Sequence, residues 1–278
     1  MSDAYRTALC QMRVTGDKEQ NHRRAAECVD EAAGCGARVV CLPEIWNSPY
    51  DMKLLAGYAE PADGPSAALM GRLAEKHGIY LIGGSIPEKD TGADKPRIYN
   101  TSFVFGPDGA AIARYRKIHL FDVDIENAVR FRESDFFTAG GDVTVFDTEY
   151  GRMGLAICFD LRFPGMFREM SEAGAHIVFA PASFNINTGA AHWDLLVKSR
   201  ALDNQFYLAA CASSRNTDAS FVTWSHSCVA TPWGEYCACA DARETIVYAD
   251  IDKNYLQKIR RELPIGFQGD ASPPASAD

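Results

Sequence analysis

The chain has 278 residues, of which 47% are hydrophobic and 23% are charged, so it can build a globular core without disulfide bonds or metal ions. Its formal net charge is −9, which argues against a nucleic-acid-binding protein, because such proteins carry a concentrated basic face. No apolar run approaches the roughly 18 residues of a membrane-spanning helix, and the N-terminus lacks the apolar core of a signal peptide. We therefore expect a cytoplasmic protein with neither a nucleic acid nor a membrane as partner.

The nine cysteines are an odd number and include no CxxC pair. Several lie in apolar runs, for example Cys10 after Ala-Leu and Cys41 between Val and Leu. This usage predicts a reducing compartment in which most thiols serve as small buried hydrophobic groups. Because zinc and iron–sulfur spacings are missing, we expect no metal and no cofactor.

Taken in chain order, short apolar runs typical of strands alternate with longer stretches typical of helices. The predicted strands are 8–12, 38–42, 79–82, 101–105, 111–115, 152–157, 176–180, 207–211, 227–230 and 245–251. The predicted helices are 17–33, 66–77, one beginning near 164, 192–203 and 253–262. Because the turn signal Gly106-Pro-Asp-Gly109 adds a hairpin to the helix-linked strands, we predict an α/β layered fold with mixed sheets. Residues 1–265 form the predicted single domain, and 266–278 a flexible tail.

Three polar residues follow the ends of predicted strands: Glu44, Lys117 and Cys158. Each alone fits an ordinary structural role, because carboxylates cap strands, lysines are solvated and cysteines pack in cores. Together they suggest acyl transfer, because a thiol is a weak nucleophile until a base removes its proton. Glu44 is the candidate base, and Lys117 the candidate stabiliser of the carbonyl oxygen, with the backbone N–H of Phe159 as a second donor.

Around these residues the sequence resembles the nitrilase superfamily, over 5–263. The matching motifs are Leu42-Pro-Glu-Ile-Trp46, Tyr115-Arg-Lys-Ile-His-Leu-Phe121, Gly154-Leu-Ala-Ile-Cys-Phe-Asp-Leu-Arg-Phe-Pro164, Gly189-Ala-Ala-His-Trp193, Ser199-Arg-Ala-Leu-Asp-Asn204 and Pro232-Trp-Gly234. The resemblance implies a four-layer αββα sandwich and a homodimer in which four helices pack at the interface. It also implies that Glu44 is the general base, Lys117 the oxyanion-stabilising residue and Cys158 the nucleophile. Glu133 matches a second, assisting glutamate, although a solvated loop carboxylate is the alternative for this position.

Within the superfamily the sequence is most similar to the omega-amidase branch, on the motifs 117–125, 131–134, 183–189, 191–196 and 201–205. Omega-amidases hydrolyse the terminal amide of 2-oxoglutaramate or 2-oxosuccinamate through a thioester and release ammonia. Such substrates carry a carboxylate, for which Arg162 is the candidate partner because guanidinium binds carboxylate with two parallel hydrogen bonds. An ion pair of Arg162 with Asp160 is the alternative. Phe184 and Thr188 are further candidate pocket residues, although Phe184 also fits a core position.

Other readings of the same residues stay open. Within the superfamily these are a deaminated-glutathione amidase, an N-carbamoyl hydrolase or a nitrilase. A papain-like Cys–His mechanism would use His119, His192 or His226 as base, and a non-catalytic binding scaffold is a different class altogether.

The chain departs from the family pattern at two places. Relatives commonly have Gly-His-Ser where this chain has Ser225-His226-Ser227, and a basic stretch where it has Gly266-Phe-Gln-Gly-Asp270. The first departure puts the local loop geometry in question, and the second the usual contacts of the tail.

Overall fold

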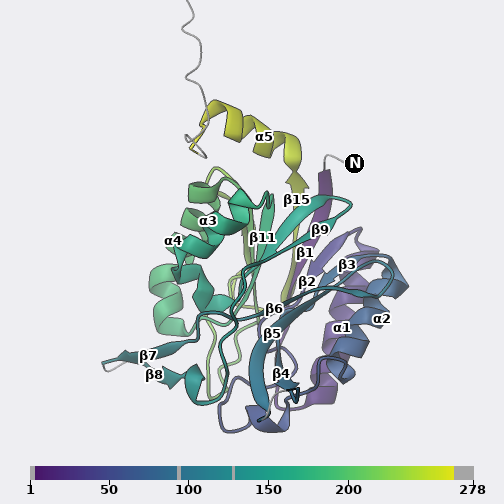
Figure 1. Cartoon of the computed structure of the whole chain (residues 1–278), viewed down its shortest axis with the longest axis vertical. Coiled ribbons are helices and arrows are strands. Elements are labelled where there is room, and N and C mark those ends of the chain that lie inside the picture. The colour runs from purple at the N-terminus through teal and green to yellow at the C-terminus, as the bar shows by residue number, and fades with distance from the viewer. Residues whose placement is uncertain (1–3, 93–94, 127–128, 266–278) are drawn as a thin grey trace, which may run out of the picture.

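The computed structural model describes residues 4–92, 95–126 and 129–265. Two β-sheets lie face to face in the centre, and helices cover the outer face of each, which makes four αββα layers (Figure 1). The predicted fold class, a mixed α/β single domain, is confirmed. The predicted tail, 266–278, and with it the departure at 266–270, lie outside the described residues.

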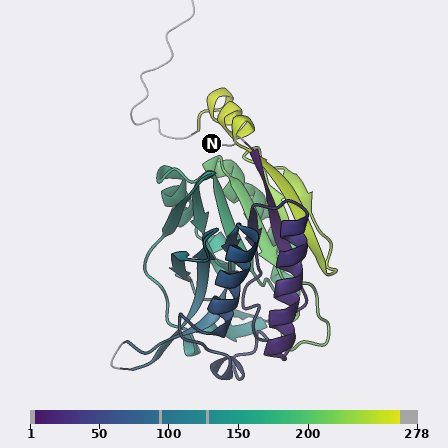
Figure 2. The same ribbon diagram turned by 90° about the vertical axis from the view of Figure 1, so that its right-hand side faces the viewer.

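The first sheet has seven strands in the order β15-β1-β2-β3-β5-β4, with β6 paired to β5. Its strands are β1 (Ala4–Gln11), β2 (Val39–Cys41), β3 (Tyr80–Ile82), β4 (Ile86–Asp90), β5 (Arg97–Phe105), β6 (Ala111–Arg116) and β15 (Thr245–Asp252). Strands β1, β2 and β3 are parallel neighbours, and the remaining pairs are antiparallel. Helices α1 (Lys18–Gly34) and α2 (Pro65–His77) lie side by side over its outer face (Figure 2).

The second sheet has six strands in the order β14-β13-β12-β11-β10-β9. They are β9 (Thr144–Thr148), β10 (Gly151–Leu155), β11 (Ile177–Ala182), β12 (Tyr207–Ala212), β13 (Cys228–Ala230) and β14 (Tyr236–Cys239). Helices α3 (Pro164–Glu172) and α4 (Ile186–Asn204) cover its outer face. Outside the layers lie the hairpin of β7 (Asp122–Ile125) with β8 (Val129–Arg132), and helix α5 (Lys253–Glu262).

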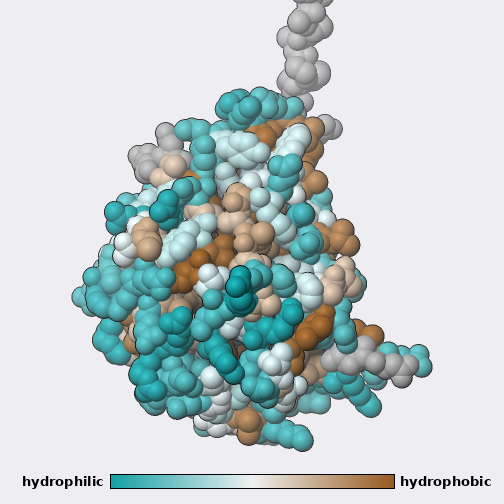
Figure 3. All heavy atoms as spheres, turned by 180° about the vertical axis from the view of Figure 1, so that it is seen from behind, coloured by the Kyte–Doolittle hydropathy of each residue, from teal (hydrophilic) through white to brown (hydrophobic). Residues whose placement is uncertain are grey.

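Strand β1 shows why the sheet strands are continuous apolar runs. Tyr5 and Leu9 point into the core between the two sheets, whereas Ala8 and Cys10 point into the core under α1 and α2. Both faces of such a strand are buried, so the alternation of a half-exposed strand is missing. Seen from behind, the surface is mostly hydrophilic, with small separate hydrophobic patches (Figure 3). Within the described ranges, no helix combines the length and the apolar character needed to cross a membrane.

The predicted strands and helices are present with shifted bounds, and the largest shift is in α4. We predicted this helix from His192, but it begins at Ile186, because Asn185 caps it by accepting a hydrogen bond from Thr188 N. Gly189 inside the helix weakened the helical signal. It is needed there because a Cβ at this position would lie 2.2 Å from Trp224 Cβ. The prediction missed β4, β7, β8, β9 and β14.

The departure at 225–227 falls on a strained turn. Ser225 has φ 70° and His226 has φ 61°, both in the left-handed region that glycine adopts most easily. Each non-glycine residue there costs about 1–2 kcal/mol. Ser225 therefore adopts a conformation that glycine favours, at the position where the family pattern has glycine.

His176 at the start of β11 makes folding stability depend on pH. Its Nδ1–H donates to the Arg152 carbonyl over 2.7 Å, and its Nε2 accepts from the Tyr5 hydroxyl over 2.8 Å. Burial lowers the pKa of His176 from 6.5 to about 4, because it disfavours the charged imidazole. Between these values the unfolded chain binds the proton and the folded chain does not. Stability is therefore complete above pH 6.5 and is lost as the pH falls towards 4.

We expect this residue to contribute a loss of about 3 kcal/mol in the free energy of unfolding over that interval. Urea unfolding at several pH values should show a steeper acid dependence for the wild type than for His176→Gln. Parallel pH curves for the two proteins would contradict the assignment.

Candidate active site

Cys158 lies just beyond the end of β10, on a sharp turn into the short 3-10 helix 158–162. Its φ is 49°, so the backbone reverses at the cysteine itself. The turn is closed by Ile157 N–H, which donates to Asp160 Oδ2 over 2.8 Å, and by Asp160 N–H, which donates to the Ile157 carbonyl. The turn fixes the direction of the Cys158 side chain, which is 5% exposed.

Asp160 holds this turn in place through several hydrogen bonds. Besides Ile157 N–H, its carboxylate accepts from the Tyr115 hydroxyl over 2.6 Å and from His119 N and Nδ1 over 3.1 and 2.8 Å. The Asp160 carboxylate therefore binds both the end of β6 with the segment after it, which carries Lys117, and the turn that carries Cys158. Through Asp160, the two sheets fix the relative positions of these two residues.

Glu44 follows β2 and enters the space between the sheets from the other side. The backbone after it is held by Ile45 N–H, which donates to Ser85 Oγ, and by Trp46 N–H, which donates to the Ser85 carbonyl. Gly84 permits this close approach, because a Cβ there would lie 2.1 Å from the Pro43 carbonyl oxygen. The Glu44 side chain is 1% exposed.

Lys117 joins the two predicted glutamates. Its Nζ lies 3.0 Å from Glu44 Oε1 and 2.9 Å from Glu133 Oε2, and all three side chains are buried. Glu133 also accepts from Phe121 N–H over 2.6 Å and from the Tyr50 hydroxyl. Glu133 is thus a buried partner of Lys117 rather than the solvated loop carboxylate of the alternative.

Burial and charge set the protonation of the site. Burial raises the pKa of the Cys158 thiol well above its usual value; the Glu44 carboxylate raises it further, and Lys117 opposes the shift. Burial also raises the pKa of Glu44, while Lys117 lowers it. For Lys117, burial alone would lower the pKa, but Glu133 and Glu44 more than offset it and leave the pKa raised. These shifts favour the thiol form of Cys158 and the ammonium form of Lys117, and they make Glu44 a stronger base than an exposed glutamate.

A cleft of about 320 Å³ opens beside Glu44. Three buried polar atoms around it make no hydrogen bond to any described residue: Glu44 Oε2, Ser48 Oγ and Thr223 Oγ1. Buried polar groups normally have partners, so these atoms are suited to a polar ligand. Tyr50 and Ser183 also line the cleft.

Arg162, at the end of the Cys158 turn, belongs to a second group of predicted residues. Its guanidinium carbon lies 5.6 Å from the Phe159 ring centre and 5.2 Å from that of Phe184. Its Nη1 lies 3.2 Å from His192 Nδ1, and not against Asp160 as the alternative had it. Burial lowers the pKa of Arg162, and the nearby Cys158 raises it. The cation is thus partly desolvated, but it is not among the residues that line the cleft beside Glu44.

The remaining two candidates, Phe184 and Thr188, lie just before α4 and in its first turn, and neither is among the residues that line the cleft beside Glu44. Phe184 is 4% exposed and meets the Trp193 ring edge-on, with 5.1 Å between the ring centres. Thr188 is in the first turn of α4, and its hydroxyl donates to Asn185 Oδ1 over 3.0 Å. Thr188 therefore takes part in the cap of α4 in this structure.

The three histidines of the papain-like alternative have other partners. His119 Nδ1 pairs with Asp160, His192 Nδ1 lies against Arg162, and His226 Nδ1 lies 3.2 Å from the Ala240 carbonyl. The groups that influence the Cys158 pKa are Glu44, Lys117, Glu133 and the backbone of Ser183. This geometry favours a carboxylate base over a histidine base.

Sequence reasoning missed several residues that complete the site. Asn100 Nδ2 donates to Glu44 Oε1 over 2.9 Å, and Tyr50 holds Glu133. Asn100 begins the run Asn-Thr-Ser102 inside a buried strand, and this polar interruption of β5 was an available signal. For Tyr50, Ser48 and Thr223 we find no such signal in the sequence, because all three lie outside the predicted elements.

The comparison with known families decides where the chain belongs. The model of the family "Carbon-nitrogen hydrolase" matches residues 6–261. The chain belongs to the carbon-nitrogen hydrolase family. The resemblance to the nitrilase superfamily is thereby confirmed, and the amidase class of enzyme with it.

Similar proteins agree with this placement. This carbon-nitrogen hydrolase is 45% identical over 262 residues to omega-amidase NIT2 from Homo sapiens, with 94% of each chain covered. It is also 45% identical over 264 residues to omega-amidase NIT2 from Xenopus tropicalis, covering 95% of this chain and 94% of the relative. Among solved structures, Nit3 from Saccharomyces cerevisiae, described as a member of branch 10 of the nitrilase superfamily, superposes with a TM-score of 0.89. The two are 36% identical, and 98% of each chain is covered.

Proposed function

We propose that this carbon-nitrogen hydrolase is an omega-amidase that hydrolyses the terminal amide of 2-oxoglutaramate or 2-oxosuccinamate. The products are 2-oxoglutarate or oxaloacetate and ammonia. The observation that carries the proposal is that Glu44 and Lys117 form a buried ion pair close enough to buried Cys158 to shift its pKa, beside a small cleft that Glu44 lines. The similarity to omega-amidases over nearly the whole chain supports the choice of substrate.

In the first stage Cys158 Sγ attacks the amide carbonyl carbon, and Glu44 takes the thiol proton. The oxygen that becomes negative is stabilised by the Lys117 ammonium and the Phe159 N–H. Glu44 then passes the proton to the amide nitrogen, the C–N bond breaks, and ammonia leaves a thioester.

In the second stage Glu44 removes a proton from water, which attacks the thioester carbonyl. The C–S bond breaks, the sulfur regains a proton from Glu44, and the carboxylic acid is released. Glu133 and Tyr50 hold Lys117 in place throughout, because both are fixed by hydrogen bonds that do not involve substrate. No step requires a metal or cofactor.

Arg162 supplies the selectivity for an acid in this proposal. It lies four residues after Cys158 on the same turn, and it is partly desolvated between two aromatic rings. A charge-assisted hydrogen bond to a carboxylate is strong in such surroundings. Phe184 lies next to Arg162, and Thr188 lies in the first turn of the helix that follows it.

The test measures ammonia release from 2-oxoglutaramate, deaminated glutathione, an N-carbamoyl amino acid and a simple aliphatic amide. We expect the highest kcat/KM for 2-oxoglutaramate. Arg162→Met should lower that value by about 10- to 200-fold, the equivalent of one charged hydrogen bond. It should change hydrolysis of the uncharged amide less than about threefold, because that substrate makes no such bond.

Arg168→Met, on α3, is the matched control and should leave kcat/KM unchanged, because Arg168 pairs with Glu172. A higher kcat/KM for deaminated glutathione would contradict the proposed substrate and favour a deaminated-glutathione amidase. An equal loss on the charged and uncharged amides would remove Arg162 from carboxylate recognition.

We also propose that two copies pair through the α3 and α4 layer. Several apolar side chains on or near it are exposed, with Leu195 67%, Trp233 46% and Leu202 38% accessible. Light scattering in solution should give the mass of two chains, and Leu195→Glu should shift it to one. A single-chain mass for the wild type would contradict this.

A reducing compartment such as the cytoplasm is consistent with nine free thiols, and cell fractionation would test it.

A further inference from the structure

Two cysteines outside the active site face each other across neighbouring strands. Cys228 on β13 is directly opposite Cys239 on β14 in an antiparallel pair. At the next position, Ala240 N–H donates to the Ser227 carbonyl over 2.9 Å, which makes that pair the hydrogen-bonded one. Because the two kinds of pair alternate, Cys228 and Cys239 occupy a non-hydrogen-bonded position.

This position brings the two thiols together. In a non-hydrogen-bonded pair the Cα atoms are about 4.5 Å apart and the side chains lie on the same face of the sheet. Disulfides span Cα separations of about 4.4–6.8 Å, so the register falls at the short end of the permitted range. A bond at that end is strained and easily reduced.

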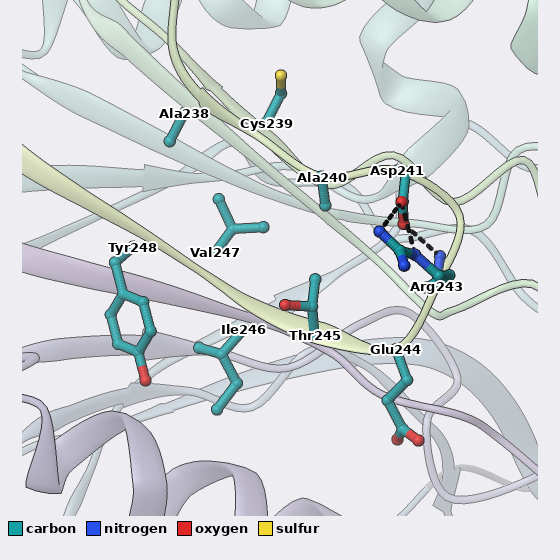
Figure 4. A pocket seen from close by; sticks show the side chains of 10 residues that line it. All are labelled: Ala238, Cys239, Ala240, Asp241, Arg243, Glu244, Thr245, Ile246, Val247 and Tyr248. Carbon is teal, nitrogen blue, oxygen red and sulfur yellow. Dashed lines mark hydrogen bonds and ion pairs between the residues drawn. The ribbon is translucent and has the colours of Figure 1, made fainter.

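The two thiols differ in accessibility. Cys228 is 1% exposed and interacts with the side chains of Trp193 and Tyr236 on the α4 side of the sheet. Cys239 is exposed. Figure 4 shows the Cys239 and Ala238 side chains pointing in opposite directions beside the groove of about 570 Å³ between β14 and β15. Burial raises the pKa of Cys228 to about 12, and the neighbouring Cys239 adds to the shift.

We propose that Cys228 and Cys239 form a reversible disulfide, and that small disulfides such as glutathione disulfide are the oxidants that this site takes. Exposed Cys239 is the entry point, and buried Cys228 is the resolving thiol. The site is separate from the catalytic set and does not rest on the proposed function.

The disulfide forms by two successive thiol–disulfide exchanges. The Cys239 thiolate attacks one sulfur of glutathione disulfide, the S–S bond breaks, and one glutathione leaves from a mixed disulfide. Cys228 sulfur then attacks Cys239 sulfur, and its proton goes to the departing second glutathione thiolate. Two protein thiols are oxidised, and one glutathione disulfide is reduced to two glutathiones.

The experiment treats the full-length protein with glutathione disulfide, alkylates free thiols and cleaves with a glutamyl protease without reductant. Cleavage after Glu235 separates Cys228 from the other two cysteines of this region, so the fragments stay joined only through a disulfide. We expect joined fragments in the wild type and their separation after mild reduction. In Cys228→Ser we expect one glutathione trapped on Cys239, because the resolving thiol is missing.

Cys237→Ser is the matched control, because Cys237 is equally exposed on β14 but lies in the bulged part of the strand. The fragments should stay joined in Cys237→Ser and come apart in Cys239→Ser. Separate fragments in the wild type, or joined fragments in Cys239→Ser, would overturn the proposal. Cys239 and Cys237 are both exposed, and the Cys237 thiol donates to the Val229 carbonyl over 3.5 Å, a role that a serine hydroxyl can also take.

Discussion

Cys158→Ser is expected to lower kcat for amide hydrolysis by at least about 10⁴-fold, in line with losses seen when a nucleophile is removed from a catalytic set. The substitution keeps the shape of the side chain but replaces the thiol with a hydroxyl, which gives up its proton far less readily. Glu44 is positioned and strengthened as a base for a thiol, and it cannot make up that difference. Steady-state ammonia release measures the loss, and intact mass spectrometry on mixing with substrate measures the thioester in the wild type.

Cys211→Ser is the matched control. Cys211 is also buried, and its thiol donates to the Cys41 carbonyl over 3.3 Å inside the core. Its serine variant should keep wild-type kcat once folded. If Cys158→Ser retained more than a tenth of the wild-type kcat, the sulfur would not be the nucleophile.

Lys117→Met is expected to have the largest effect on stability, a loss of about 3–5 kcal/mol in the free energy of unfolding. The ammonium offsets the charges of Glu44 and Glu133, and both carboxylates stay buried when it is removed. Turnover should be lost as well, because the carbonyl oxygen loses a charged donor. Urea unfolding followed by circular dichroism measures the stability, and adding Glu133→Gln should restore part of it by removing one buried charge.

Lys76→Met tests whether any lysine ion pair would behave in this way. Lys76 pairs with Asp30 over 2.8 Å, but the side chains are 57% and 44% exposed. Its loss should cost at most about 1 kcal/mol, because solvent screens exposed pairs. Equal stabilities of the Lys117 and Lys76 variants would show that the buried charges are compensated by other means.

The sequence was informative where burial dictates residue type. Runs such as Val39-Val-Cys41 and Tyr207–Ala212 have no reason to be apolar throughout unless both faces of the strand are covered, and both were predicted as strands. The polar residues that interrupt or end such runs stand out against them. Glu44, Lys117 and Cys158 were selected in this way; in the structure Glu44 and Lys117 form a buried ion pair, and both influence the pKa of Cys158.

The strands that the sequence did not predict are held in place by contacts with other elements rather than by an apolar pattern of their own. Strand β4 reads Ile-Pro-Glu-Lys-Asp and lies at a sheet edge, where Ile86 joins the core but Glu88 and Asp90 bind Arg116 of β6. The β7–β8 hairpin is largely exposed, so its apolar pattern is weak. Likewise, the roles of Asp160 and Tyr50 depend on partners 45 and 83 positions away along the chain. The residues that surround Asp160 and Tyr50 in the sequence do not indicate partners so far away along the chain.

The enclosure of the Cys158 sulfur bears on how this enzyme can be inhibited. The sulfur belongs to a side chain that is only 5% exposed, so bulky alkylating reagents reach it less readily than they reach the exposed cysteines. A small aldehyde that places its carbonyl where the amide carbonyl sits would instead trap the sulfur as a hemithioacetal, with Glu44 carrying the thiol proton to the new hydroxyl group. Compounds of that kind, with a carboxylate at the far end, are the chemotype that we expect to discriminate this cysteine from the accessible ones on the surface.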